Sequence, residues 1–226
     1  MLEQLEELLG VHFQDTTLLK LALTHRSYIY ETSGAGQSSN ERLEFLGDSI
    51  LALISADFLY HTFPHLSEGE LTDVRAVLVR TETLAKFARD INLNTFLRMG
   101  KGEQHSGGGQ RVLASAFEAI LGAIYLDQGL TRVQAFLIPW LDPIAHTIVE
   151  KRLFKDNKSL FQELAQAHDG ITPSYRIASQ EGPSHNREFT VEVLVGDRVA
   201  GRGQGRNKQT AEQEAARQAL ISRGWI

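Results

Sequence analysis

Apolar residues recur at intervals of three and four through most of the first 150 positions, which is the spacing of amphipathic helices. No alternation of apolar and polar residues, as in a strand, occurs before residue 170. Asn40 is expected to be the N-cap of a long helix that runs from Glu41 towards Tyr60. The other helices predicted in this part cover residues 2–9, 18–23, 70–80, 81–90, 112–126 and 130–150, and a glycine-rich loop is predicted over 100–109.

The pattern of the chain changes after residue 150. A charged, weakly periodic stretch at 151–157 is typical of a linker. The elements predicted beyond it are a helix over 158–168, strands over 173–178, 189–195 and 199–205, and a helix over 209–223. We therefore predict an all-α domain over 1–150, followed by a small α+β domain of α-β-β-β-α order over 158–226.

Composition excludes several classes of protein. Of the 226 residues, 42% are hydrophobic and 23% are charged, which is ordinary for a globular chain and argues against disorder. The absence of cysteine excludes disulfides, thiol nucleophiles and cysteine-ligated metals. The longest apolar run, over 119–126, is much shorter than the roughly 18 residues of a membrane span, and the acidic N-terminus is unlike a signal peptide. We expect a cytoplasmic protein with no membrane partner.

Charge is distributed unevenly between the two predicted domains. Residues 1–150 hold 19 Asp and Glu against 11 Lys and Arg, a net charge of −8, whereas residues 151–226 hold 9 against 12, a net charge of +3. An acidic domain can hold cations, and a basic domain can attract a polyanion such as a nucleic acid. The alternative is that the asymmetry reflects chance and solubility alone.

Three carboxylates share one face of the long predicted helix. Glu41, Glu44 and Asp48 fall within about 60° of one another at helical spacing, and the leucine and isoleucine residues at positions 43, 46, 50 and 53 lie on roughly the opposite side. Like charges at this spacing destabilise a helix unless a cation compensates them. An ordinary solvated acidic face is the alternative interpretation.

A fourth carboxylate strengthens the interpretation as a cation site. Glu118 lies within the apolar, alanine-rich helix predicted over 112–126, where an unpaired buried charge would cost several kcal/mol. Packing of this helix against the acidic helix would bring the four carboxylates together. Hard oxygen ligands favour Mg²⁺ or Mn²⁺, and such a site suits hydrolysis of a phosphodiester.

Residues 40–49, Asn-Glu-Arg-Leu-Glu-Phe-Leu-Gly-Asp-Ser, resemble the signature of the bacterial ribonuclease III family almost residue for residue. Further blocks at 23–28, 68–72 and 117–123 resemble that family, and 182–185 and 203–208 resemble its double-stranded-RNA-binding domain. The resemblance implies a homodimeric, Mg²⁺-dependent endoribonuclease that cleaves double-stranded RNA, with Mn²⁺ as a substitute metal. It also implies products with 5′-phosphates and short 3′ overhangs, and substrates among ribosomal and messenger RNA precursors.

The resemblance also implies roles for individual residues. Glu44, Asp48 and Glu118 correspond to metal-site carboxylates, and the catalytic acids are these three together with Glu41. Glu68 corresponds to a further acid that lines the cleft. Phe45 corresponds to an aromatic residue that reaches into a pocket of the other subunit. Its position near the acidic face, rather than the apolar one, is explained better by a dimer contact than by burial within one subunit.

Ser115 is a departure from the family pattern. Many members have an aspartate at this position, three residues before Glu118, and that aspartate also supports the metal. A serine hydroxyl can hydrogen-bond a metal-bound water but brings no charge. We therefore expect an indirect role for Ser115 and a weaker or altered metal preference, with activity retained.

The tail is expected to recognise the shape of double-stranded RNA through two minor grooves and the phosphates between them. The residues expected to contact RNA are Gln162, Glu163 and Gln166 on the first helix, Ser184 and His185 in the loop before the second strand, and Arg206, Asn207 and Lys208 before or at the start of the last helix. The positive end of the last helix would assist phosphate binding. Alternatively, Arg206 and Lys208 are ordinary solvated charges.

The favoured interpretation is therefore a double-stranded-RNA-specific endoribonuclease. One rival is a dimeric RNA-binding protein on the same scaffold that is catalytically weak or inactive, for which Ser115 is the only supporting feature. A second rival is an acidic helical scaffold with an unrelated protein-binding tail. Metal-dependent cleavage that is lost on substitution of Glu118 separates a nuclease from either rival.

Overall fold

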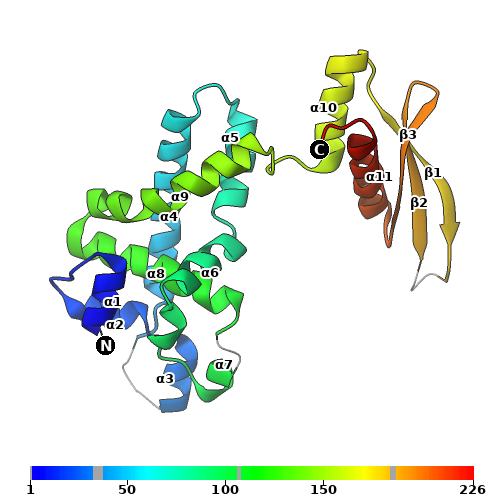
Figure 1. Ribbon diagram of the computed structural model, residues 1–226. Helices are drawn as coiled ribbons and strands as arrows, with labels where there is room; N and C mark the ends of the chain where they lie inside the picture. Colours follow the sequence, from blue (N-terminus) through cyan, green and yellow to red (C-terminus); the bar gives the residue numbers. More distant parts are fainter. Residues whose placement is uncertain (1, 33–37, 106–107, 184–186) are drawn as a thin grey trace. The chain divides into compact units, whose positions relative to one another are not determined.

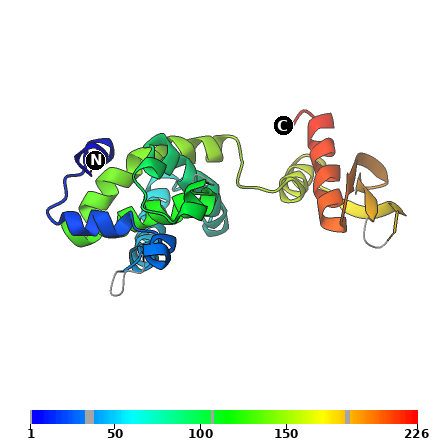
Figure 2. The same ribbon diagram turned by 90° about the horizontal axis from the view of Figure 1, so that it is seen from below.

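The computed structural model describes residues 2–32, 38–105, 108–183 and 187–226 (Figures 1 and 2). The chain forms two compact units, Met1–Phe154 and Lys155–Ile226. The first unit consists of helices, and its described residues form no strand beyond one isolated bridge between Thr24 and Arg98. Those helices are α1 (Leu2–Leu9), α2 (Thr16–Ala22), α3 (Arg26–Thr32), α4 (Glu41–Thr62), α5 (Glu68–Leu78), α6 (Thr81–Asp90), η1 (Leu93–Thr95), α7 (Lys101–His105), α8 (Gln110–Gln128) and α9 (Leu130–Glu150).

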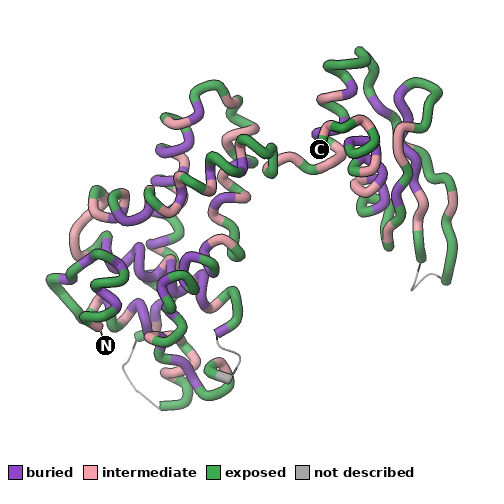
Figure 3. The backbone as a smooth tube through the Cα atoms, in the orientation of Figure 1, coloured by how far each residue is buried: buried purple, intermediate pink, exposed green. Residues whose placement is uncertain are grey.

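Helix α8 forms the centre of the first unit and packs against α2, α4, α6 and α9. Ten of its residues between Leu113 and Ile124 are buried, which agrees with the alanine-rich apolar sequence predicted over this helix. Figure 3 shows this buried core where the helices converge. Because α8 is enclosed on several sides, the polar residues it carries must face whichever part of its surface is left open.

Two glycines allow α4 and α8 to cross at very short distance. Gly47 on α4 lies against the backbone of α8, and Gly122 on α8 lies against the backbone of α4, where a Cβ atom would come within 2.4 Å of the Leu43 carbonyl oxygen. A side chain at either position would force the helices apart. The absence of Cβ atoms therefore sets how closely residues of α4 approach those of α8.

Asn40 occupies the N-cap position of α4, as predicted, but its side chain does not cap the helix. Its backbone is already helical, no capping hydrogen bond forms, and its buried side-chain amide instead donates to the carbonyl oxygen of Ala22 at 3.1 Å. Ala22 is the last residue of α2, whose terminal carbonyls need partners. Asn40 thus provides a hydrogen-bond donor for a carbonyl at the end of α2, a helix that precedes it in the sequence.

Three other local predictions differ from the structure. Leu53, placed on the buried side of α4 by its angle, is 56% exposed, because no described element of this chain covers that face. The stretch over 100–109, predicted to be a loop, contains the helix α7. The start of this helix is supported by Glu31, whose carboxylate accepts a hydrogen bond from the backbone N–H of Lys101 at 2.9 Å. Helix α5 begins two residues earlier than predicted because Ser67 and Glu70 form a capping box.

The second unit has the predicted α-β-β-β-α order. Its sheet is antiparallel with strand order β1-β2-β3, and α10 and α11 lie on one face of it (Figure 1). Glycines in β3 let α11 approach closely, since a Cβ atom on Gly203 would lie 2.1 Å from the backbone nitrogen of Ala215. The elements are α10 (Asn157–Asp169), β1 (Ser174–Glu181), β2 (Glu188–Val195), β3 (Arg198–Gly205) and α11 (Lys208–Ser222).

No helix in the described ranges is both long enough and apolar enough to span a lipid bilayer. The apolar helix α8, for example, carries Ser115 and Glu118 in its middle turns.

Candidate active site and RNA-binding surface

Four carboxylates from two helices line one open depression of about 360 Å³. Glu41, Glu44 and Asp48 come from α4, and Glu118 comes from α8. The close crossing of the two helices at Gly47 and Gly122 brings Glu118 opposite the acidic face of α4. The convergence that the sequence only suggested is thus present in the first unit.

The negative charge of this depression is poorly compensated. Within the described parts of the chain, no ion pair within 4 Å reaches Glu44, Asp48 or Glu118. The pKa of Glu118 is raised to about 7, chiefly by burial and also by the neighbouring charges of Asp48 and Glu44. A cation placed between these groups would relieve that repulsion.

The donor set fits a hard divalent cation, although the carboxylates that line the depression are not yet close enough to share one ion. No three His, Cys, Asp or Glu side chains among the described residues stand close enough to hold a metal ion as they are placed. The available ligands are carboxylate oxygens, which Mg²⁺ and Mn²⁺ prefer. Asp48 is exposed, so its side chain has room to rotate towards Glu118.

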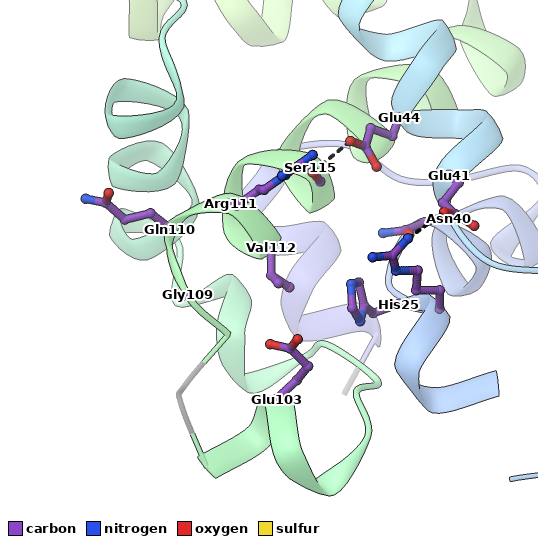
Figure 4. Close-up of a pocket in the computed structure, with 11 residues that line it drawn as sticks. His25, Asn40, Glu41, Glu44, Glu103, Gly109, Gln110, Arg111, Val112 and Ser115 are labelled. Atoms are coloured by element: carbon purple, nitrogen blue, oxygen red, sulfur yellow. Dashed lines mark hydrogen bonds and ion pairs between the residues drawn. The ribbon is translucent and has the colours of Figure 1, made fainter. Parts of the chain in front are cut away.

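Ser115 contacts a site carboxylate directly. Its hydroxyl donates a hydrogen bond to Oε1 of Glu44 at 2.8 Å, across the interface between α8 and α4 (Figure 4). The sequence had suggested a contact with a metal-bound water for this hydroxyl. The structure gives the hydroxyl a protein partner, Glu44, and the contact with a metal-bound water stays a prediction.

A second pocket of about 490 Å³ adjoins the acidic depression and shares Glu41 and Glu44 with it. Arg111 points towards Ser115 at one side of this pocket (Figure 4), and Arg26 forms a 3.5 Å ion pair with Glu41. Sequence reasoning missed both arginines as site residues. The available signal was that Arg111 precedes Ser115 by four residues, which places them on the same side of α8.

The structure places Phe45 and Glu68 in different depressions of the same unit. The ring of Phe45 is 77% exposed and lines the acidic depression. Glu68 begins α5 and lines another depression of about 450 Å³, together with apolar residues such as Leu59 and Leu71. Within one chain, therefore, Glu68 does not meet the other four acids.

Helix α10 presents a polar depression of about 430 Å³. It is lined by Ser159, Gln162, Glu163, Gln166 and Thr172. The side-chain oxygen of Gln166 accepts a hydrogen bond from the Thr172 hydroxyl at 2.9 Å, and Glu163 forms an ion pair with Lys155. The three α10 residues expected to contact RNA are therefore neighbours on one exposed surface. Ser184 and His185 lie outside the described residues.

The start of α11 combines a cap with exposed cations. The side-chain oxygen of Asn207 accepts hydrogen bonds from the backbone N–H and the hydroxyl of Thr210, at 2.8 and 3.0 Å, so that Asn207 is the N-cap of α11. Arg206 is exposed beside it. Lys208 is 61% exposed at its side chain and lies 3.7 Å from the nearly buried carboxylate of Glu212, which Lys158 also contacts at 2.6 Å.

Family comparisons identify both units. The family model described as Ribonuclease-III-like matches residues 15–143, and the model for the double-stranded RNA binding motif matches residues 157–222. A helical unit with a carboxylate-lined depression, joined to a double-stranded-RNA-binding module, defines the class of protein: an endoribonuclease that hydrolyses double-stranded RNA.

Individual relatives agree over nearly the whole chain. The curated Ribonuclease 3 of Pelotomaculum thermopropionicum is 46% identical over 219 residues, covering 96% of this chain and 91% of that protein. The Ribonuclease 3 of Oceanobacillus iheyensis is 47% identical over 220 residues, covering 96% of both chains. The solved nuclease domain of ribonuclease III from Campylobacter jejuni is 36% identical, with a TM-score of 0.59 over 63% of this chain and 97% of that domain. The chain belongs to the ribonuclease III family.

Proposed function

We propose that Glu44, Asp48 and Glu118 hold Mg²⁺ in the acidic depression, with Mn²⁺ as a substitute, and that double-stranded RNA is cut there. Ribonuclease III enzymes depend on a metal, and the comparisons leave open which one. The observation that carries the proposal is the position of Glu118, which lines one depression together with Glu44 and Asp48 and has no cationic partner among the described residues. The raised pKa of Glu118 agrees with this crowding of negative charge. Negative charge without a partner does not stabilise the free protein, and it favours the binding of a cation.

The protein side chains divide the work of hydrolysis among them. A divalent cation supplies charge neutralisation at the phosphate and activation of water. Glu44, Asp48 and Glu118 would hold that cation. Because the pKa of Glu118 is raised to about 7, binding of a cation would favour its ionised form, and the proton would be released to solvent. Glu41, held at the rim by Arg26 and by the Ser39 hydroxyl at 2.7 Å, is placed to orient the substrate. We expect products with 5′-phosphates and short 3′ overhangs.

We further propose that the chain works as a homodimer through α4 and α5. Phe45, Leu53 and Tyr60 are exposed along α4, at 77%, 56% and 67%, which is an unusual apolar surface for a monomer. The nuclease domain from Campylobacter jejuni is described as structurally flexible in a region involved in dimer formation. In this chain, the depression of about 450 Å³ beside α5 is lined mainly by apolar and aromatic residues, with Glu68, Thr72 and Arg75 among them, and offers a socket for an aromatic ring.

This dimer would complete the acidic depression. Phe45 lines that depression, and Glu68 lines the proposed socket. Insertion of Phe45 into the socket of the other chain therefore brings the partner subunit's Glu68 beside the four acids. The arrangement gives Glu68 the cleft-lining role expected from the sequence, which it does not have within one chain.

The second unit supplies affinity for the RNA duplex. We propose that Gln162, Glu163 and Gln166 contact one minor groove and that the loop with Ser184 and His185 contacts the next. Arg206 and Lys208 bind the phosphates that lie between the two minor grooves, and Asn207 caps the end of α11 beside these two cations. Natural substrates are proposed to be ribosomal and messenger RNA precursors in the cytoplasm.

A catalytically weak or inactive double-stranded-RNA-binding protein is the second candidate. Ser115 favours it, because a neutral hydroxyl stands where many members of the family have an acid, and it bonds to Glu44. The two candidates share the RNA-binding unit, so that RNA affinity does not distinguish them.

Cleavage of a long, perfectly paired RNA, with and without Mg²⁺, tests the proposal. Wild-type protein should cut it into short duplexes only with metal, and Glu118→Ala should abolish cutting while retaining RNA binding. Glu7→Ala, at an exposed acid of α1, is a matched control that should cut normally. Tight binding without cutting, in Mg²⁺ and Mn²⁺ alike, would establish the second candidate instead.

A further inference from the structure

Ser115 and Glu44 form a side-chain contact between the two helices that make the acidic depression. Ser115 is half-buried on α8, one turn before Glu118, and its hydroxyl donates to Oε1 of Glu44 at 2.8 Å. In the described parts of the chain this is the one side-chain partner recorded for the carboxylate of Glu44. The orientation of Glu44 therefore depends on a neutral donor.

The two helices joined by this hydrogen bond are in close backbone contact beside it. Gly47 lies one turn after Glu44, and Gly122 lies two turns after Ser115, at the point where the helices touch through their backbones. Since neither helix can shift without breaking that contact, the hydrogen bond restrains mainly the rotamer of Glu44. Glu44 is common to the acidic depression and the adjoining pocket, so that this restraint affects both.

A neutral donor also limits repulsion within the depression. A carboxylate at position 115 would stand within hydrogen-bonding distance of Glu44, in a region where no ion pair among the described residues reaches Asp48 or Glu118. Two carboxylates that close repel each other unless a proton or a cation separates them. With serine at position 115, this repulsion between carboxylates is replaced by a hydrogen bond from Ser115 to Glu44.

We infer that Ser115 is a positioning residue, which holds Glu44 in its cation-binding orientation before the metal arrives. This inference rests on the proposed function of Glu44 as a metal ligand. The carboxylate of Glu44 then loses little rotamer freedom when a cation binds, so that the hydrogen bond compensates in part for the absence of an acid at position 115. Ser115 acts through Glu44 and does not contact the reacting phosphate.

Direct titration of the full chain with Mn²⁺ by calorimetry tests the inference. Ser115→Ala should weaken Mn²⁺ affinity about tenfold, which is typical for loss of a residue that orients a metal ligand. Ser115→Thr keeps the hydroxyl and should restore affinity to near the wild-type value. Ser55→Ala removes another hydroxyl hydrogen bond on α4, to the Leu51 carbonyl at 2.7 Å, and is the matched control that should leave affinity unchanged.

The crystal structure of metal-free Ser115→Ala provides an independent readout. The Glu44 side chain should leave the position it occupies in the wild-type chain, whereas the contact of Gly47 with α8 should persist. Unchanged Mn²⁺ affinity in Ser115→Ala, or equal losses in the alanine and threonine variants, would overturn the inference while leaving the proposed function intact. Absence of Mn²⁺ and Mg²⁺ binding to the wild-type chain would overturn both.

Substitution by aspartate tests the electrostatic part. Ser115→Asp should lower the melting temperature of the metal-free protein, because a fifth carboxylate then faces Glu44. It should also increase the rise in melting temperature on addition of Mn²⁺, since the cation relieves more repulsion. A metal-free melting temperature equal to that of the wild type would contradict the proposed repulsion.

Discussion

A Cβ atom at Gly47 would lie 1.8 Å from the backbone carbonyl oxygen of Glu118. Helix α4, which carries three of the site acids, is therefore in direct backbone contact with α8, which carries Glu118. The contact lies at Gly47, one residue before Asp48. The separation of the carboxylates follows from this contact, because their side chains extend from two backbones that lie at this short distance.

Substitution of Gly47 should accordingly damage both the fold and the site. We expect Gly47→Ala to destabilise the protein by about 3 kcal/mol, since the added methyl group meets backbone rather than a flexible side chain. Urea denaturation measures this change. Gly69→Ala is the matched control, because a Cβ atom there meets nothing within 4 Å, and its effect should be within about 1 kcal/mol. Equal stability of Gly47→Ala and wild type would show that the helices can separate freely.

The stability of the metal-free protein should depend on the ionisation of Glu118. Its pKa is raised from 4.5 to about 7, so that the folded state holds the proton more tightly than the unfolded state. The resulting stability is present in full below about pH 4.5 and is lost as the pH rises through 7. Because Glu118 is only half-buried, we expect a loss of about 1–2 kcal/mol after allowance for solvent screening.

Comparison with Glu118→Gln isolates this effect. Denaturation in EDTA at several values between pH 5 and pH 8 should show the wild type losing stability relative to the variant, with little further change above pH 8. Addition of Mg²⁺ at pH 8 should stabilise the wild type alone. A difference between the two proteins that is independent of pH would contradict the raised pKa.

Phe45→Ala should weaken the proposed homodimer. Loss of a central aromatic anchor typically costs at least about 2 kcal/mol, which corresponds to a roughly thirtyfold weaker dimer. Sedimentation equilibrium measures the dissociation constant. Tyr30→Ala, at an 81% exposed aromatic residue on α3, controls for loss of an exposed ring and should not change it. A monomeric wild-type chain at micromolar concentration would contradict the proposal at the outset.

Arg206→Ala should reduce affinity for duplex RNA without regard to its sequence. The exposed guanidinium beside the N-cap of α11 is proposed to bind a phosphate, so that its loss should lower the dependence of log affinity on log salt concentration by about one unit. Fluorescence anisotropy at several salt concentrations measures the slope. Arg198→Ala, at the exposed start of β3, is the control. An unchanged slope for Arg206→Ala would indicate an ordinary solvated charge.

Much of this protein could be predicted from the chain itself, because the relevant signals are local. Apolar periodicity changes after residue 150 from a helical to a mixed pattern, and the structure has helices before that point and an α-β-β-β-α unit after it. The spacing of Glu41, Glu44 and Asp48 places them together on α4, where they line one depression. Helical geometry alone determines such neighbours.

Other features depend on partners far away in the sequence. The amide of Asn40 bonds to the end of α2 rather than capping α4, and Glu31 on α3 supports the start of α7. Leu53 is exposed although its angle suggests burial. The hydroxyl of Ser115 is bonded to Glu44, which is 71 residues earlier in the chain. Local periodicity indicates which face of a helix a residue occupies, whereas only tertiary packing determines what that face meets, because contact distances between helices depend on every residue at the crossing.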